Sequence, residues 1–272
     1  MRFLYFSLLP AVVLAQTPPD LARERAAFAT WLTADARSPY AALAMQPIGR
    51  GLTLGPAPSD IELAGIGRAS LTETDGVVRL GGAAPGVAGR ALPRGRPVPF
   101  GPYRLAIDGE PGRSVAVVYG APRHAAPPAF YPYDAALTVV GTLAAAPRPT
   151  AQRLLALDGV EVEATLAGTF DARLGDARIQ LVVYRMPDPT GEESDLMIYF
   201  RDLTSDRGSY PAGRFVTLEP AGGGRYRLDF NRARNPLCAY STVFPCPVPW
   251  PGNTLALPVA AGERYVPQRA NP

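Results

Sequence analysis

Lysine is absent from the sequence, and all 27 basic residues are arginine. The missing amine excludes Schiff-base chemistry, attachment of pyridoxal phosphate and the lysine of a P-loop. Histidine is almost as rare: His124 is the only one, so a zinc site built on two or more histidines cannot form within one chain. With 24 acidic residues the formal net charge is +3, which is too small to indicate binding to nucleic acid or to an anionic membrane.

Familiar catalytic motifs are also missing. The chain has no G-x-S-x-G, S-x-x-K, H-E-x-x-H or P-loop sequence. The nearest glycine-rich string, GIGRAS from Gly65, lacks the final glycine of a dinucleotide-binding loop. His124 lies among prolines with no local partner for a catalytic triad, and we interpret it as a surface residue. No cofactor is predicted, and whether the protein is an enzyme stays open at this point.

The N-terminus has the pattern of a secretory signal peptide. In MRFLYFSLLPAVVLA, Arg2 supplies the charged region, an apolar stretch runs from Phe3 to Leu14, and Ala15 provides a small residue for cleavage. No later stretch approaches the roughly 20 apolar residues of a membrane-spanning helix. We therefore predict a signal peptide over residues 1–15 and an exported protein, periplasmic or extracellular, without a transmembrane segment. An uncleaved anchor is the alternative.

The only two cysteines, Cys238 and Cys246, lie in the proline-rich run RNPLCAYSTVFPCPVPWPGN. Proline removes backbone donors and fixes φ, so this run cannot be a central strand or a helix. In an oxidising compartment two cysteines allow one intramolecular disulfide, which would stabilise the run by roughly 2.5 kcal/mol. A zinc site on the two thiolates is the alternative, but the paired Cys-x-x-Cys halves of such sites are missing.

One helix and two β-rich regions are predicted along the chain. The segment PPDLARERAAFATWLTADAR, within residues 16–37, has apolar residues at helical spacing and predicts an amphipathic helix. Short β-type runs such as IELAG, RASLTE, GVVRLGG, YRLAID and SVAVVYG then indicate a β-sandwich-like domain over residues 38–120. Residues 121–136 are rich in proline and aromatics and are interpreted as a linker or strap.

The remainder, residues 137–272, predicts a second β-rich domain with seven strand-like runs, from LTVVGTLA to GRYRLDFN. In the last run Tyr226, Leu228 and Phe230 alternate with polar residues as far as Asn231, as in a strand with one buried face. The predicted fold class is mainly β: an N-terminal helix, a β-sandwich-like region and a second β-rich region stapled by one disulfide.

A dense polar set occupies FRDLTSDRGSYPAGRF, LDFNRARNPLCAY and GNTLALPVAAGE. Such residues are costly to bury unless paired, so the set either joins loops together or lines a pocket. The acid/base candidates are Asp202, Asp229 and Glu263. The ligand-binding candidates are Arg201, Tyr210, Arg214, Asn231, Asn235, Tyr240 and Asn253. No metal is predicted; calcium on Asp229, Asn231 and Glu263 is an alternative that no D-x-D-x-D loop supports.

These segments resemble the C-terminal signature of the domain-of-unknown-function 1684 family: F-R-D-x-T…Y-x-x-G-R-F, then D-F-N-x-A-x-N-P-x-C-A-Y, C-P-x-P and A-G-E. The resemblance runs directly from Phe200 to Glu263, and the upstream segments follow the family's order more loosely. Arg234, Leu237 and Thr254 depart from the pattern, where the family tends to an aromatic, a proline and an arginine. The resemblance implies a fold and a set of candidate positions, and it carries no activity.

A weaker resemblance concerns LTLGPAPSDIELAGIGRASLTETDGVVRL, which is similar to the opening strands of a forkhead-associated β-sandwich. That family holds phosphate with a Gly-Arg pair and a Ser-x-x-His turn. Here Gly55 precedes Pro56 and the region has no histidine, so the resemblance implies the fold without phosphopeptide binding.

Two functions are compatible with these patterns. The first is a non-catalytic exported module that binds a small molecule or a cell-envelope partner. Catalytic motifs are absent, and the sequence predicts a mainly β fold with one disulfide. The second is a hydrolase in which an arginine holds a negative charge and Asn235 stabilises a developing one. The hydrolase requires Asp202, Asp229 and Glu263 to converge on one site.

Overall fold

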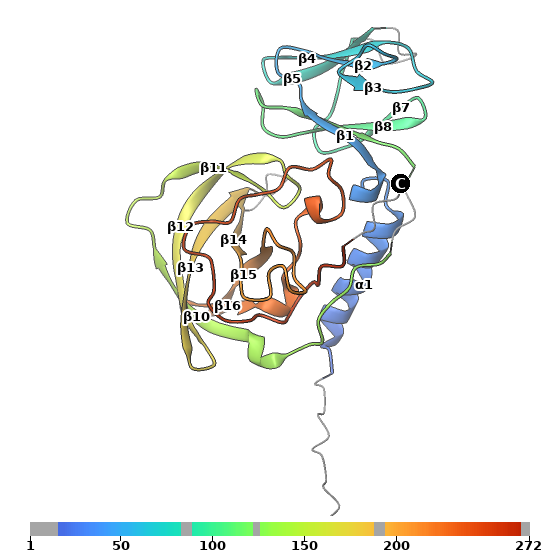
Figure 1. Cartoon of the computed structure of the whole chain (residues 1–272). Helices are drawn as coiled ribbons and strands as arrows, with labels where there is room; N and C mark the ends of the chain where they lie inside the picture. Colours follow the sequence, from blue (N-terminus) through green and yellow to red (C-terminus); the bar gives the residue numbers. More distant parts are fainter. Residues whose placement is uncertain (1–15, 83–88, 122–125, 188–193, 268–272) are drawn as a thin grey trace, which may run out of the picture.

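The computed structural model describes residues 16–82, 89–121, 126–187 and 194–267, so the predicted signal peptide and His124 lie outside the described residues. Figure 1 shows two β units, with helix α1 (Pro19–Ala34) lying along the lower one and leading to the upper one. The upper unit holds strands β1 to β9 and the lower unit holds β10 to β16. The prediction of a mainly β protein with an N-terminal helix and one disulfide is confirmed.

Helix α1 forms where the apolar spacing predicted it. Pro19 occupies its first turn, where a missing N–H is harmless, and Asp20 favours the positive end of the helix. The buried side chains of the helix lie on one face: Leu21, Phe28 and Leu32. A 3₁₀ turn, η1 (Pro39–Ala41), then carries the chain into the upper unit.

The upper unit is a sandwich of two sheets around one apolar core. One sheet has the order β1-β9-β8-β7, and its strands are β1 (Ala42–Pro47), β7 (Val98–Phe100), β8 (Tyr103–Asp108) and β9 (Val115–Tyr119). The other has the order β3-β2-β4-β5-β6, and its strands are β2 (Leu52–Gly55), β3 (Ile61–Glu62), β4 (Ala69–Thr74), β5 (Val77–Gly82) and β6 (Arg90–Ala91). The IELAG run yields only the two residues of β3, because the chain turns at Gly65, whose φ is +73°.

The lower unit is a six-stranded barrel, a closure that the strand pattern did not predict. Strands β12 to β16 and β10 pair in sequence around it, and pairing of β10 with β12 closes it, while β11 extends the sheet beside β12. The elements are η2 (Ala135–Leu137), β10 (Thr138–Ala145), β11 (Ala151–Leu155), β12 (Glu161–Leu174), β13 (Ala177–Pro187), β14 (Ser194–Phe200), β15 (Arg214–Gly222) and β16 (Arg225–Asp229).

Two glycines permit the closure. A Cβ at Gly141 would lie 2.2 Å from the carbonyl oxygen of Asp171, and one at Gly168 would lie 2.1 Å from that of Ala144. Side chains at these positions would separate β10 from β12, so we infer that the barrel can close only with glycine there.

The C-terminal tail fills the barrel. Leu255, Val259 and Ala261 join the inward residues of the strands in a single core, and the tail crosses the barrel in red in Figure 1. The last predicted strand ends earlier than its alternation suggested. Phe230 and Asn231 are buried in the 3₁₀ turn η3 (Phe230–Arg232), whose N-terminus the Asp229 side chain caps.

The stapled proline run lies where the two β units meet. Cys238 and Cys246 form a disulfide, as predicted, and the first cysteine belongs to the 3₁₀ turn η4 (Leu237–Ala239). Leu237 and Phe244 pack on the outer face of the sandwich, whereas Trp250 packs on the outer face of the barrel. The run therefore contacts both units through its side chains. The predicted domain boundary at residues 121–136 stays a prediction.

A strap, residues 126–134, lies between the two units in the chain. Its backbone pairs with the C-terminal tail: Tyr131 N donates to Gly262 O at 2.9 Å, and Arg264 N donates to Ala129 O at 2.8 Å. The strap therefore holds the tail from outside while the barrel core holds it from inside.

Candidate functional site

The first part of the predicted polar set is a buried ion pair between Asp202 and Arg214. Their side chains are 0% and 1% exposed, and Arg214 Nη2 lies 2.8 Å from Asp202 Oδ2. Arg214 also donates to the carbonyl oxygens of Val259, at 2.8 Å, and of Ala261. Burial lowers the pKa of the Arg214 guanidinium, and the Asp202 charge opposes that effect. The pair thus fastens the tail inside the barrel.

Asp202 has no oxygen left for chemistry. Its Oδ1 accepts from Thr204 N at 2.7 Å, from Thr204 Oγ1 at 2.6 Å and from Val259 N at 3.1 Å. A carboxylate with donors on both oxygens and a guanidinium beside it is a poor general base. Asp202 therefore links Thr204, Arg214 and Val259 of the tail.

Asn253 and Arg201 also connect segments. Asn253 is 0% exposed; its Oδ1 accepts from Val182 N at 2.7 Å, and its Nδ2 donates to Val182 O at 2.9 Å and to Tyr199 O at 3.0 Å. Arg201 pairs through its backbone, with N 2.9 Å from Asn253 O and O 2.8 Å from Leu255 N. Both residues position the tail against β13 and β14.

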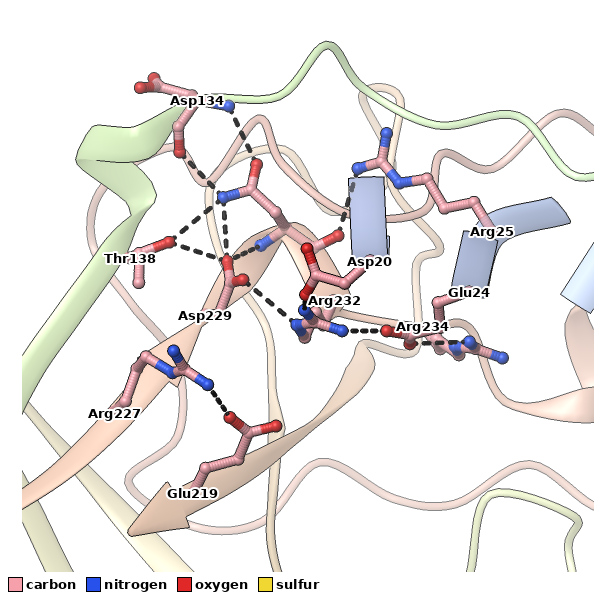
Figure 2. A network of polar contacts seen from close by, with 11 residues as sticks. Asp20, Glu24, Arg25, Asp134, Thr138, Glu219, Arg227, Asp229, Arg232 and Arg234 are labelled. Atoms are coloured by element: carbon pink, nitrogen blue, oxygen red, sulfur yellow. Dashed lines mark hydrogen bonds and ion pairs between the residues drawn. The ribbon is translucent and has the colours of Figure 1, made fainter. Parts of the chain in front are cut away.

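Asp229 lies at the centre of a polar network (Figure 2), and Asn231 bonds to it. Asp229 Oδ1 accepts from Thr138 Oγ1 at 2.9 Å and from Asn231 N and Nδ2 at 3.0 and 2.9 Å. Asn231 also binds the backbone of Asp134. Asp134 N donates to Asn231 Oδ1 at 3.0 Å, and Asn231 Nδ2 donates to Asp134 O at 2.8 Å. Asp229 Oδ2 lies 3.4 Å from Arg232 Nε. The network anchors the end of the strap on the barrel.

Helix α1 is clamped onto the same network, as Figure 2 shows. Arg232 pairs with Asp20 and Glu24 of the helix, and Arg234 Nη2 lies 2.9 Å from Glu24 Oε1. Arg25 donates to Asn231 O at 3.2 Å. These contacts join residues more than 200 positions apart, and the sequence pattern gave no sign of them.

Between the helix and the barrel lies a pocket of about 160 Å³. Met197 and Phe215 contribute apolar surface to it, and Glu24, Arg232 and Arg234 contribute charge. Because these charges already pair with one another, the pocket offers little uncompensated charge to a ligand.

Glu263 is held differently from Asp202 and Asp229. It is fully buried, its Oε2 accepts from Asn235 N at 2.9 Å, and its Oε1 has no hydrogen-bond partner among the described residues. Burial raises the pKa of its carboxyl to about 8, against the opposing effects of Asn235, Arg234 and Arg214. Glu263 is therefore mostly a neutral acid at pH 7.

A cluster of aromatic rings lies along the buried face of α1. The ring of Tyr240 lies 5.7 Å from that of Tyr40 and 6.4 Å from that of Phe28. Burial, and then the Glu263 charge, raises the pKa of Tyr40 to about 12. Tyr240 Oη and Asn235 Oδ1 are buried without a hydrogen-bond partner in the described part of the chain. Asn235 and Glu263 thus share one buried region, and Tyr240 belongs to the aromatic cluster.

Tyr210 packs on the disulfide. Its hydroxyl lies 3.4 Å from Cys238 Sγ and 3.3 Å from Cys246 Sγ, and its ring lies 4.9 Å from that of Tyr265. Burial raises the pKa of the Tyr210 phenol. Tyr210 is therefore not grouped with any of the three carboxylates.

The carboxyl groups of the candidates have different hydrogen-bond partners, although Arg214, the partner of Asp202, also donates to the backbone oxygen of Glu263 at 3.4 Å. Asp202 bonds to Arg214, Asp229 bonds to Asn231 and the strap, and Glu263 is enclosed with Asn235. The three carboxylates do not form a shared acid/base centre. In the part of the chain that the structure covers, no group of three or more histidine, cysteine, aspartate or glutamate side chains could hold a metal ion.

Sequence reasoning missed a cleft of about 610 Å³ on the outer face of the barrel. Leu166 of β12, Val182 and Tyr184 of β13, and Pro251 of the stapled run contribute to its walls, and residues 144–147 form one rim. The sequence does contain an indication of this cleft. In the run IQLVVYRM, from Ile179 to Met186, apolar residues occupy both faces of the strand. Such a strand has an apolar outer face that something must cover.

Among the described residues, none of the helices combines the length and apolarity needed to cross a membrane. No curated protein matches the chain. The chain is similar to the solution NMR structure of an uncharacterized protein of Haloarcula marismortui, with 30% identity and a TM-score of 0.43 over 51% of this chain and 76% of that one.

One family model matches residues 128–264, which comprise most of the strap, the barrel and the tail and include every candidate residue named above. The matched range does not include α1 or the sandwich. The chain belongs to the family described as protein of unknown function DUF1684.

Proposed function

We propose that the protein is a non-catalytic ligand-binding module that works outside the cytoplasm, in the cell envelope. The observation that carries the proposal is that the carboxyl groups of Asp202, Asp229 and Glu263 are each bonded to a different internal partner, while an uncharged cleft lies on the outer face of the barrel. Largely preformed, mostly apolar hollows of roughly 300–1,000 Å³ are typical ligand sites. The signal-like N-terminus and the Cys238–Cys246 disulfide support an oxidising location.

A hydrolase is the second candidate. Glu263, with a pKa of about 8, has the protonation state of a general acid at neutral pH. Its carboxyl is fully buried, however, so a substrate could reach it only if the covering segments moved. The binding function needs no such movement and ranks first.

Mass spectrometry of the full chain, exported by a Gram-negative host and purified without detergent, tests the proposal. We expect a mature chain that starts at Gln16 and carries, under native conditions, an additional mass that denaturation removes. Native protein without any such mass, together with hydrolysis of model esters or amides that Glu263→Gln abolishes, would contradict a non-catalytic binding role. Retention of residues 1–15 would contradict the predicted processing alone.

A further inference from the structure

The interior of the outer-face cleft is uncharged. None of the residues that line it carries a formal charge, and the walls include Leu166, Val182 and Pro251. Two of its polar side chains satisfy each other, because Tyr184 Oη donates to Gln152 Oε1 at 2.9 Å. Burying a charged or strongly polar group here would cost its hydration without replacement. The part of a ligand that enters the cleft is therefore apolar.

The walls of the cleft are held in place without a ligand. Trp250, the residue before Pro251, packs with its ring 4.7 Å from Tyr184 and 6.1 Å from Tyr199. Asn253 bonds to both backbone polar groups of Val182. A preformed wall reduces the ordering that binding requires, so apolar contact in the cleft contributes directly to affinity.

One cation directly follows the rim in the sequence. Arg148 directly follows Pro147, a lining residue, and it precedes Pro149. It is exposed and forms no hydrogen bond or ion pair with any residue of the described ranges. Other arginines of the barrel do pair with carboxylates: Arg153, Arg178, Arg214, Arg227, Arg232 and Arg234. An anionic group at the rim would meet an unpaired guanidinium.

We propose that the cleft binds a single-chain anionic amphiphile, with its aliphatic chain against Leu166 and Val182 and its carboxylate at Arg148. This inference rests on the proposed binding function and names the class of ligand. The charge at the rim and the uncharged interior match the two ends of such a molecule. The carboxylate could come from a free fatty acid or from a lipid surface, and we assign the free acid because the cleft has the volume of a site for one small molecule.

Calorimetric titration with straight-chain saturated carboxylates, below their micelle concentrations, tests whether the cleft binds the aliphatic chain of the ligand. Each buried methylene should raise the affinity about fourfold until the cleft is full. Val182→Gln should remove most of this dependence on length, whereas Val162→Gln, on a half-buried β12 residue outside the cleft, should keep it. Affinity that is independent of chain length, or equal in the two variants, would overturn the proposal.

Comparison of each carboxylate with the alcohol of equal length tests the rim. Arg148→Gln should weaken carboxylate binding about tenfold and leave alcohol binding unchanged. Arg173→Gln, at an exposed arginine of β12 outside the cleft, should change the binding of neither ligand. Equal effects of Arg148→Gln on both ligands would show that the rim does not recognise the anion, and binding to anionic phospholipid vesicles without binding to free carboxylates would refute the free acid.

The two proposals fail in different ways. If Val182→Gln still carries an additional mass under native conditions that denaturation removes, the binding function is retained and this cleft is excluded as the site. Absence of any bound mass together with Glu263-dependent turnover would remove the binding function itself.

Discussion

Two buried carboxyl groups near the C-terminal tail lie in opposite environments. Asp202 has a guanidinium at 2.8 Å and donors on both oxygens. Glu263 has one hydrogen bond, to Asn235 N, and its pKa is raised to about 8. Burial is equally complete at both positions. Burial alone therefore does not fix the charge of a carboxyl group. The hydrogen-bond donors within reach decide whether it is paired as an anion or held as a neutral acid.

Removal of the partner of Asp202 should have the largest effect. In Arg214→Met the Asp202 carboxylate stays buried without its cation, and the tail loses donors to the carbonyls of Val259 and Ala261. We expect a loss of about 3–5 kcal/mol in the free energy of unfolding, measured with urea under non-reducing conditions.

The control for this change is the exposed pair between Arg178 and Asp171, where Arg178→Met should cost less than about 1 kcal/mol. The double variant Asp202→Asn/Arg214→Met should recover part of the loss, because it no longer buries an unpaired charge. If Arg214→Met and Arg178→Met cost the same, Asp202 would not differ from a surface carboxylate.

Glu263 should instead make stability depend on pH. Its folded pKa of about 8 exceeds the unfolded value near 4.5, so the folded state binds the proton more tightly. The stabilisation is complete below about pH 4.5 and is lost progressively as the pH rises to about 8, at roughly 1.4 kcal/mol per pH unit. Glu263→Gln removes this dependence, and at pH 7 the variant should be more stable than wild type by at most about 3 kcal/mol.

The measurement is the difference between the unfolding free energies of wild type and Glu263→Gln from pH 4 to pH 9. The difference is needed because burial also raises the pKa values of Asp108 and Asp158, which contribute a slope of the same sign to both proteins. A flat difference curve would mean that Glu263 is ionised in the fold and resembles Asp202 after all.

The sequence predicted the elements better than their closure. The helix could be read from the spacing of Leu21, Phe28 and Leu32, and many strands could be read from alternation. Closure of the barrel could not be predicted, because it depends on the close approach of the β10 and β12 backbones at Gly141 and Gly168. A glycine in a strand-like run signals a close approach but does not name the segment that approaches.

Many of the polar candidates bond to other segments, as the first of the two sequence interpretations expected, but their grouping could not be predicted. Asp202 and Arg214 lie in one motif, yet the tail carbonyls that complete their bonding lie at residues 259 and 261. The charge state of Glu263 depends on its complete burial and on Asn235, Arg234 and Arg214, which lie 28 or more positions away, and no local pattern encodes this environment. Long-range packing therefore decided which carboxyl became an anion and which a neutral acid.

The smallest effect is expected where charges of both signs are half-exposed. Glu24→Gln removes the pairing of α1 with Arg232 and Arg234, and we expect a loss below about 1 kcal/mol that shrinks further in about 1 M salt. Urea unfolding at low and high salt measures it, with Glu219→Gln, which unpairs Arg227 away from the helix, as the matched control. The buried side chains of Leu21, Phe28 and Leu32 should keep the helix docked in both variants. If Glu24→Gln alone lost several kcal/mol, this network would stabilise the fold as strongly as the Asp202–Arg214 ion pair. The charged pocket beneath α1 would then be a stronger candidate site than its paired charges now suggest.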